Sequence, residues 1–200
     1  EHATVSSRVK GLFVKEVDQI VWTYKLAPET INVPAHADVQ EIQVLTISLK
    51  TASLTEELLR VIDRAIPSPV LFRLSFEDRE RYVATFKRPS EADRGKWVIG
   101  DYFWTEWLGA DAPRKPLPVQ LDLRGLYHAL LEPMVAVVGS VGERLEARIE
   151  RSATLRQLER ELARLENKLK QEKQYNRKVE IHAELLIIKA EIMGIETGHE

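Results

Sequence analysis

The chain has 200 residues, 44% of them hydrophobic and 30% charged, which excludes disorder and leaves room for one ordinary domain plus an appendage. Its 29 basic and 31 acidic residues give a net charge of -2, which excludes a broad attraction to a phosphate backbone or an acidic membrane. The lack of cysteine excludes disulfides and Cys-ligated metals, and with no apolar run of membrane-spanning length and no signal peptide we expect a cytoplasmic protein.

The first part of the chain alternates between helical and extended patterns. Apolar residues at a helical period predict a helix over residues 6–20, and the β-prone residues 21–26 predict a strand. Pro28 and Pro34 then exclude a helix interior or a central strand through residues 31–33, which we expect to form a loop or edge segment. A second strand is predicted over residues 39–50, with apolar side chains on both of its faces.

A capping signal marks the start of the next helix. Ser53 and Glu56 have the spacing of a capping box, in which the Ser oxygen accepts a backbone N–H and the Glu carboxylate reaches back. Pro67 ends the helix. Its predicted buried stripe consists of Leu54, Leu58, Leu59 and Ile62.

Three β-rich runs follow the second helix, over residues 70–76, 81–87 and 96–108. The charged residues 77–80 predict an exposed hairpin turn, and residues 90–95 form a second polar connection. These runs predict an antiparallel meander. The order of elements predicts an α+β fold, a small mixed or antiparallel sheet with flanking helices.

Aromatic residues gather in the last of these runs. Strand alternation sends Tyr102 and Trp104 to one face of the sheet and Phe103 and Trp107 towards the other. Core packing is the favoured interpretation of these rings. Trp104 and Trp107 remain candidates for an exposed binding surface.

Three prolines between residues 109 and 118 interrupt regular structure and mark a change in composition. We therefore predict an α+β domain over residues 1–109, a Pro-rich linker over 110–120 and a helical region over 121–200. The helical region opens with a helix over residues 121–134, which Pro133 ends or kinks.

The strongest periodic signal lies in the last 60 residues. Two seams have the spacing of a coiled coil but are out of phase with each other, so we predict a hairpin over residues 141–195 with its turn near 171–176. A continuous helix is the alternative. The first seam consists of Leu155, Leu158, Leu162, Leu165 and Leu169, and the second of Ile181, Leu185, Ile188, Ile192 and Ile195.

Charge favours the hairpin. Residues 151–178 hold nine basic and four acidic residues, whereas residues 179–200 hold one basic and five acidic residues. Folding one segment onto the other would pair opposite charges. A two-helix hairpin leaves apolar side chains partly bare. We therefore expect either packing on residues 123–131, or a homodimer or protein partner through these helices with Leu158, Leu162 and Leu165 as interaction residues.

A basic stripe follows the first of these helices, because Arg156, Arg160, Arg164 and Lys168 recur every four residues. Such a stripe can track phosphates, which keeps a nucleic-acid-binding accessory protein as an alternative function. Three glutamates lie among these residues, so an ordinary solvated flank of the coiled coil is the favoured interpretation.

Catalytic motifs are missing from the sequence. It has none of the Gly-rich phosphate-binding loops, no G-x-S-x-G, and its five His never occur as a pair four residues apart. A metal-dependent nuclease needs an acidic residue on one strand and an Asp/Glu-x-Lys motif on the next. In the strand that ends at Lys50, Ser48 stands where the carboxylate should be. Asp78, Glu80 and Lys87 lie on a hairpin, but their spacing does not match the motif. His128 lies on a predicted helix beside Tyr127, and an ordinary surface or interface residue is its favoured interpretation. We therefore expect no catalytic residue, metal or cofactor.

Four segments together resemble a known family. They are residues 22–34 (WTYKLAPETINVP), 62–70 (IDRAIPSPV), 86–93 (FKRPSEAD) and 174–181 (QYNRKVEI). In this order and at these intervals they are similar to the prokaryotic family DUF4391, a domain of unknown function. Members of that family carry a basic, Pro-containing segment before the first helix, whereas this chain begins at Glu1.

The resemblance implies no activity and no catalytic residue. It does imply an association with helicase and DNA-methyltransferase genes of restriction or phage-defence type. We therefore expect a non-catalytic protein-interaction or accessory module of such a DNA-processing system. The alternatives are a nucleic-acid-binding accessory protein that uses the basic stripe, and a divergent metal-dependent nuclease.

Overall fold

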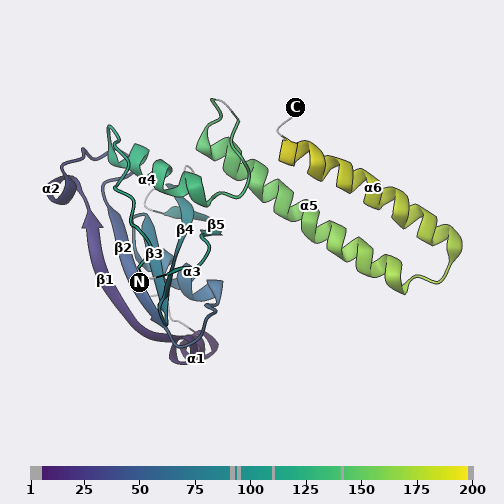
Figure 1. Cartoon of the computed structure of the whole chain (residues 1–200), viewed down its shortest axis with the longest axis horizontal. Coiled ribbons are helices and arrows are strands. Elements are labelled where there is room, and N and C mark those ends of the chain that lie inside the picture. Colours follow the sequence, from purple (N-terminus) through teal and green to yellow (C-terminus); the bar gives the residue numbers. More distant parts are fainter. Residues whose placement is uncertain (1–5, 91–92, 94–95, 110, 141, 198–200) are drawn as a thin grey trace. The chain divides into compact units, whose positions relative to one another are not determined.

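The computed structural model describes residues 6–90, 93, 96–109, 111–140 and 142–197. The chain divides into two compact units, Glu1–Met134 and Val135–Glu200, and the Pro-rich segment lies within the first. The first unit holds a mixed six-stranded sheet with flanking helices, and the second holds two helices that form a hairpin (Figure 1). The predicted α+β class with a C-terminal helical hairpin is confirmed.

The strands of the first unit lie in the order of the chain. They are β1 (Val17–Leu26), β2 (Ile42–Leu49), β3 (Val70–Phe76), β4 (Arg79–Pro89) and β5 (Trp97–Trp104). β2 and β3 are parallel because helix α3 (Glu56–Ala65) crosses over between them, and the other neighbours are antiparallel. The short β6 (Leu108–Gly109) pairs with the start of β4. This arrangement confirms the predicted meander of β3, β4 and β5.

Helix α1 (Ser7–Glu16) is shorter than its sequence pattern predicts. The prediction of a helix to residue 20 is wrong, since the chain enters β1 at Val17. There Val17 pairs with Leu49, and Ile20 pairs with Ile47. Pairing with β2 replaces the helical hydrogen bonds, although the apolar spacing fits a helix as well as a strand.

The connection from β1 to β2 contains one helical turn, α2 (Pro28–Ile31). Pro28 occupies its first position, where the missing N–H has no partner to lose. The turn ends at Asn32 in the left-handed region, with φ 54°, a conformation that Asn adopts more readily than most residues.

The N-terminus of α3 is capped from another helix. The predicted capping box at Ser53 is wrong, because the N-cap is Thr55 and the Glu16 carboxylate of α1 supplies the acceptors. The Thr55 backbone N–H and hydroxyl donate to it at 2.6 and 2.7 Å. A buried carboxylate beside a helix N-terminus also complements the helix dipole, so this contact ties α1 to α3.

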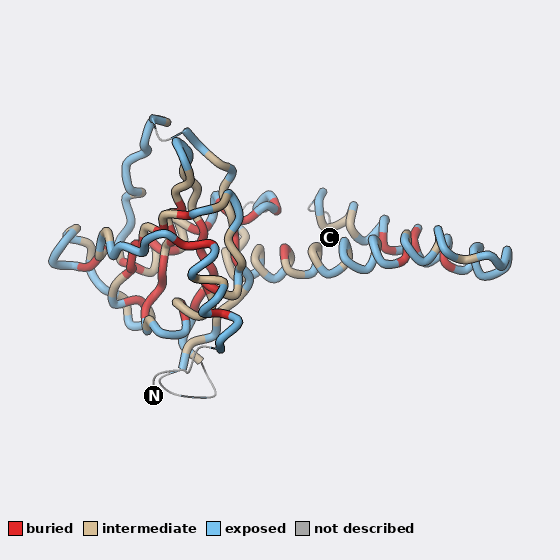
Figure 2. Tube along the Cα trace, turned by 90° about the horizontal axis from the view of Figure 1, so that it is seen from below, coloured by how far each residue is buried: buried red, intermediate tan, exposed pale blue. Residues whose placement is uncertain are grey.

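Helices α1 and α3 cover one face of the sheet, and the main core lies between these helices and the sheet. Figure 2 shows the buried residues gathered inside the first unit. The predicted stripe on α3 is confirmed: Leu58 and Leu59 are fully buried, and Leu54 and Ile62 pack at its margin. The side chains that fill this core from the sheet include Leu45, Ile47, Val70, Phe72, Leu74, Val83 and Tyr102.

The opposite face of the sheet carries α4 (Leu123–Leu131), which continues into the 3₁₀ turn η1 (Glu132–Met134). The Asp122 side chain caps α4 by accepting the Gly125 N–H at 2.8 Å. The Tyr127 ring stacks on Phe86 at 6.3 Å, and its hydroxyl donates to the Thr85 carbonyl. The predicted helix over residues 121–134 therefore exists, with its last turn tightened at Pro133.

The second unit is a helical hairpin of α5 (Leu145–Gln171) and α6 (Tyr175–Thr197). Residues 172–174 connect the two helices, which confirms the predicted turn. The expected start at Val141 lies outside the described residues, and the described helix begins at Leu145. Among the described residues, no helix is long and apolar enough to cross a membrane.

Candidate functional site

The predicted seams meet inside the hairpin. Leu165 of α5 and three residues of α6 are buried together. Leu158 and Leu162 pack at the margin of the same cluster, so the three leucines expected to contact a partner instead hold α5 against α6 within the hairpin. The α6 members are Ile181, Leu185 and Ile188, and the other marginal residues are Leu169 and Ile192.

Polar contacts lock the open end of the hairpin. The Arg151 guanidinium donates to Glu143 at 3.0 and 2.8 Å and to the Ile195 carbonyl of α6 at 2.9 Å. The hydrogen bond from Arg151 lowers the pKa of the Glu143 carboxyl. Sequence patterns missed this clamp, because its acceptors include a backbone carbonyl that comes close only after the helices fold together.

The expected pairing of charges between the two helices takes an unexpected form. An ion pair joins Glu166 of α5 to Lys189 of α6 at 3.4 Å. Each belongs to the minority charge of its own segment. This ion pair is therefore not a result of the opposite net charges of the two segments. The apolar seam is the main contact between the helices.

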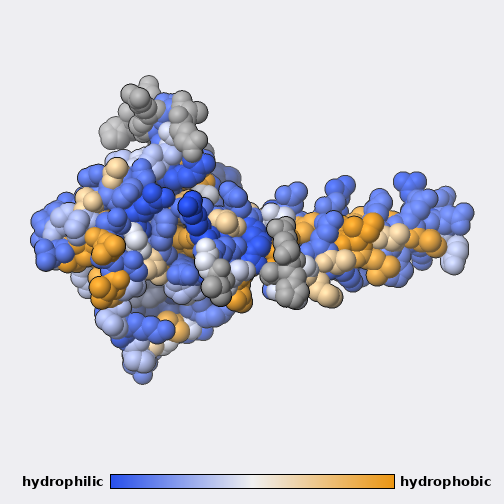
Figure 3. All heavy atoms as spheres, turned by 90° about the horizontal axis from the view of Figure 1, so that it is seen from above, coloured by the Kyte–Doolittle hydropathy of each residue, from blue (hydrophilic) through white to orange (hydrophobic). Residues whose placement is uncertain are grey.

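The outward face of α6 is also apolar. Val179, Leu186 and Met193 are 53%, 63% and 64% exposed, and exposed Ala183 and Ala190 lie between them. The five residues have 4-3-4-3 spacing, which is the spacing of a coiled-coil seam. Ile187, 60% exposed, lies beside them, and Figure 3 shows hydrophobic side chains in a band along the hairpin.

These six residues, Val179, Ala183, Leu186, Ile187, Ala190 and Met193, form what we call the outer seam. It lies on α6 opposite the buried seam, because neighbouring members of the two seams are offset by about half a helical turn. The signal was present in the sequence. The seam prediction selected the side of α6 where every member is Ile or Leu, and it passed over the opposite side, where Ala alternates with larger apolar residues.

The predicted basic stripe lies on α5. Arg160, Arg164 and Lys168 are exposed, whereas Arg156 is half-buried and its Nε donates to the Ser152 carbonyl at 3.4 Å. Three cations four residues apart thus remain on one side of the helix. The spacing allows contacts to a phosphate backbone at successive turns.

The two candidate tryptophans are partly packed in the sheet unit. Trp104 and Trp107 both contact the Arg81 guanidinium, 4.4 and 5.2 Å from their ring centroids. The prediction that they point to opposite faces is wrong, because β5 ends at Trp104 and strand alternation does not extend to Trp107. Burial lowers the pKa of Arg81. The three side chains form a cation–π clamp at the margin of the core.

A second exposed apolar surface follows the edge strand β1. Ile20, Val21, Trp22 and Tyr24 are all exposed. Edge strands can pair with a strand of another chain, but irregular register between Val17 and Gln19 and between Trp22 and Tyr24 disturbs the free edge. β1 is therefore less suited to binding than the outer seam.

A buried ionic cluster joins α3 to the sheet. The Lys87 ammonium of β4 donates to the carbonyls of Asp63 at 2.6 Å and of Ser68 at 3.0 Å, and it lies 3.5 Å from the Asp63 carboxylate. The Tyr102 hydroxyl donates to the other oxygen of that carboxylate. The Ile66 carbonyl also accepts from Lys87.

Burial perturbs each group of this cluster. It raises the pKa of the Asp63 carboxyl, against the opposing effects of Tyr102 and Lys87, and it lowers the pKa of the Lys87 ammonium. Both side chains are fully buried, so no substrate can reach them. We conclude that the cluster holds the end of α3 on β4 and is structural.

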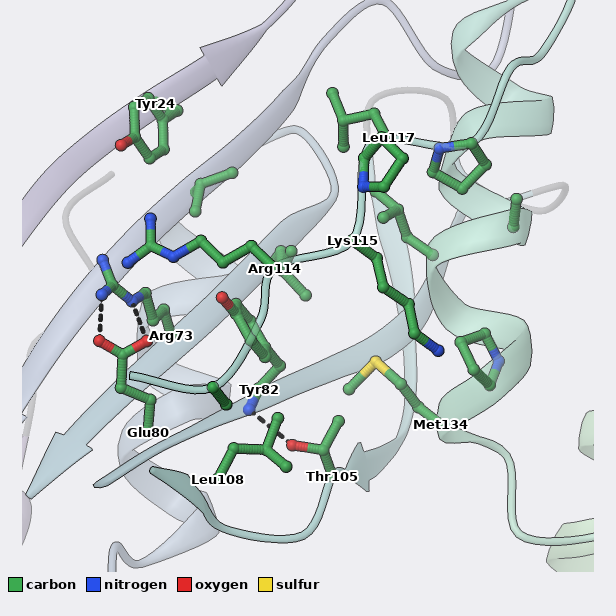
Figure 4. Close-up of a pocket in the computed structure, with 18 of the residues that line it drawn as sticks. Tyr24, Arg73, Glu80, Tyr82, Thr105, Leu108, Arg114, Lys115, Leu117 and Met134 are labelled. Atoms are coloured by element: carbon green, nitrogen blue, oxygen red, sulfur yellow. Dashed lines mark hydrogen bonds and ion pairs between the residues drawn. The ribbon is translucent and has the colours of Figure 1, made fainter. Parts of the chain in front are cut away.

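A cavity of about 670 Å³ lies between residues 112–118 and the face of the sheet that carries α4 (Figure 4). Tyr24 and Tyr82 line it together with aliphatic side chains, and Figure 4 shows Arg114 extending towards Arg73. The Arg73 guanidinium is paired with Glu80, which raises the pKa of Arg73. The size is that of a small-molecule site.

The charged groups of the cavity are mostly basic. Among the described residues that line it, the one carboxylate, Glu80, is held by Arg73, and no histidine is present. In the described part of the chain, no three His, Asp or Glu side chains are grouped as metal ligands.

Comparisons with known proteins identify the family alone. The family described as Domain of unknown function (DUF4391) matches residues 1–192. No curated protein and no solved structure matches the chain.

Proposed function

Since this chain belongs to the DUF4391 family, whose function is unknown, we propose from its own surface that it is a non-catalytic interaction module. The hairpin of α5 and α6 is the docking element. The outer seam of α6 is the surface that binds. The sheet unit supplies a folded body to which the docking element is attached.

The exposed outer seam is the observation that carries this proposal. Large apolar side chains scattered singly on a surface need no explanation, but a seam at coiled-coil spacing along a helix is a surface that another helix can cover. α6 already uses its opposite side to hold α5. The outer seam lies outside the cluster that holds the hairpin together, which supports a role in binding.

The partner chemistry follows from the seam. Apolar side chains at 4-3-4-3 spacing accept a helix with its own apolar stripe, whose side chains fit between those of α6. The family resemblance makes a DNA-processing system of restriction or phage-defence type the context in which we place this module.

Co-purification tests the docking function. A tagged chain is recovered from its source cell as the natural protein and as the double variant Leu186→Glu, Ile187→Glu. We expect the variant to lose the chains that accompany the natural protein, because two buried charges would oppose docking. The matched control is Val14→Glu, at a residue 73% exposed on α1.

The control variant should recover the same chains as the natural protein. If the double variant recovers them equally well, the outer seam is not the docking surface. The proposal would then fail.

The basic stripe supports a second candidate function, nucleic-acid binding, because Arg160, Arg164 and Lys168 are exposed along one helix. Three phosphate contacts would make the binding constant fall with salt at a logarithmic slope of about -2.7 on duplex DNA. Replacing all three residues by Gln should abolish both the binding and its slope. A shallow slope, or binding unchanged in the triple variant, would exclude the stripe as the binding surface.

A further inference from the structure

We infer that the outer seam of α6 binds the outer seam of a second copy of this chain, with the two α6 helices antiparallel. This inference rests on the proposed docking function and names its partner. The free face, its side-chain sizes and its flanking charges each point to a second copy.

Side-chain size along the seam determines the orientation. In heptad terms Ala183, Ala190 and Thr197 occupy one core position, and Val179, Leu186 and Met193 occupy the other. A parallel pair would place like against like, so thin Ala–Ala layers would alternate with thick Leu–Leu layers. An antiparallel pair places one small residue against one large residue in every layer.

The antiparallel register that does this is centred at the level of residue 188. Its layers join each residue to one of the second copy: Val179 to Thr197, Ala183 to Met193, and Leu186 to Ala190. The combined size of the two side chains changes little from layer to layer, so the helix axes can stay at one separation along the contact.

The flanks of the seam agree with this register. Ile187 lies next to Ile187 of the second copy near the symmetry axis, which would cover an exposed apolar side chain. His182 lies near Glu196 of the second copy. Lys189 approaches its own counterpart, but the ion pair with Glu166 of α5 compensates its charge.

The area of the seam is sufficient for a specific contact. Each large apolar residue of the outer seam is more than half exposed, on the order of 100 Å² per residue, and Tyr175 extends the same face by one turn. The two copies together would bury about 1,000 Å², which reaches the lower bound of a specific interface. We therefore expect a dimer that dissociates on dilution.

Native mass tests the association. The purified chain is followed by sedimentation over a hundredfold range of concentration. We expect a shift from one to two chains as the concentration rises, and Leu186→Glu should remain a single chain throughout. Val14→Glu should behave as the natural chain, and unchanged helical circular dichroism in Leu186→Glu would show that the hairpin still folds, since Leu186 is outside the buried seam.

Cross-linking tests the orientation, and the cysteine-free chain allows single cysteines to be placed. Ala183→Cys and Met193→Cys are mixed, one of them tagged, and treated with a short bifunctional thiol reagent. In the antiparallel register the mixture yields a cross-linked heterodimer. Neither variant links to itself, because equal positions are about 15 Å apart along the axis.

Opposite results overturn the inference. Efficient linking of each variant to itself, without the heterodimer, would show a parallel pair. A single chain at every concentration would exclude the second copy as the partner. In that case, loss of a co-purified partner in the Leu186→Glu, Ile187→Glu variant would still support the proposed docking function. If no partner is lost either, both the inference of a dimer and the proposed docking function fail.

Discussion

Lys87 shows how one residue can hold two elements together. Its stem crosses the core from β4, and its ammonium reaches three carbonyls and one carboxylate at the end of α3. The three carbonyls lie in or just beyond the last turn of α3, where backbone carbonyls have no partner within the helix. The buried cation therefore satisfies groups that would otherwise be buried without a donor.

Removal of this cation should be costly. We expect Lys87→Met to lower the free energy of unfolding by about 3 to 5 kcal/mol, because Asp63 would keep a buried carboxylate without its cation. Urea unfolding followed by tryptophan fluorescence measures the loss. Replacing both partners, Lys87→Met with Asp63→Leu, should recover part of it, since the carbonyls would still lack a donor.

The matched control is Lys10→Met, at an exposed position of α1, which should change the free energy by less than about 0.5 kcal/mol. A loss below about 1 kcal/mol in Lys87→Met would show that the cluster is not a structural tie. It would also reopen the question of whether these residues have another role.

Among the elements, α6 has two apolar sides: one packs against α5 and the other is exposed. Leu162 packs from α5 into the seam between the helices, whereas Leu186 lies on the outer seam. We expect Leu162→Asp to unfold the hairpin, because it places a charge between the helices. Leu186→Asp, the same change on the free side, should leave the helix content unchanged.

The helix content and thermal transition of both variants are measured by circular dichroism at low protein concentration, where the proposed dimer is dissociated. The helical signal of the second unit should fall in Leu162→Asp, and its thermal transition should move to a lower temperature. If the thermal transition of Leu162→Asp equals that of the natural chain, Leu162 does not hold the two helices together.

At the scale of the whole molecule, neither unit presents a catalytic constellation in its described residues. The buried Asp63 and Lys87 are sealed from solvent, and the carboxylate in the cavity is held by Arg73. We therefore expect no cleavage of duplex or single-stranded DNA in the presence of Mg²⁺ or Mn²⁺, measured by release of labelled fragments.

The decisive opposite result would be metal-dependent cleavage that disappears when Glu80 is replaced by Gln. Glu80 is the acidic residue exposed to the cavity, so it is the position at which a hidden activity is most readily tested. Such cleavage would favour the divergent nuclease over the interaction module.

Elements whose signal is local could be predicted from the sequence. Periodic leucines and isoleucines, a phase break and a polar turn defined the α5–α6 hairpin, and alternating β-branched runs with charged turns defined the meander of β3, β4 and β5. The stripe of Leu58 and Leu59 was equally readable. In each case the property of a single segment decides the outcome, because period and turn chemistry act over a few residues.

Only the tertiary structure decided features that need distant residues. The helix predicted to residue 20 ends at Glu16 because β2 is available for pairing, and Thr55 is capped because Glu16 arrives from α1. Lys87 could not be paired with Asp63 from spacing alone, since 24 residues separate them. Likewise, α6 is apolar on both sides, and while the seam that holds Leu185 was predicted, the exposure of Leu186 on the opposite side depends on what the rest of the chain leaves uncovered.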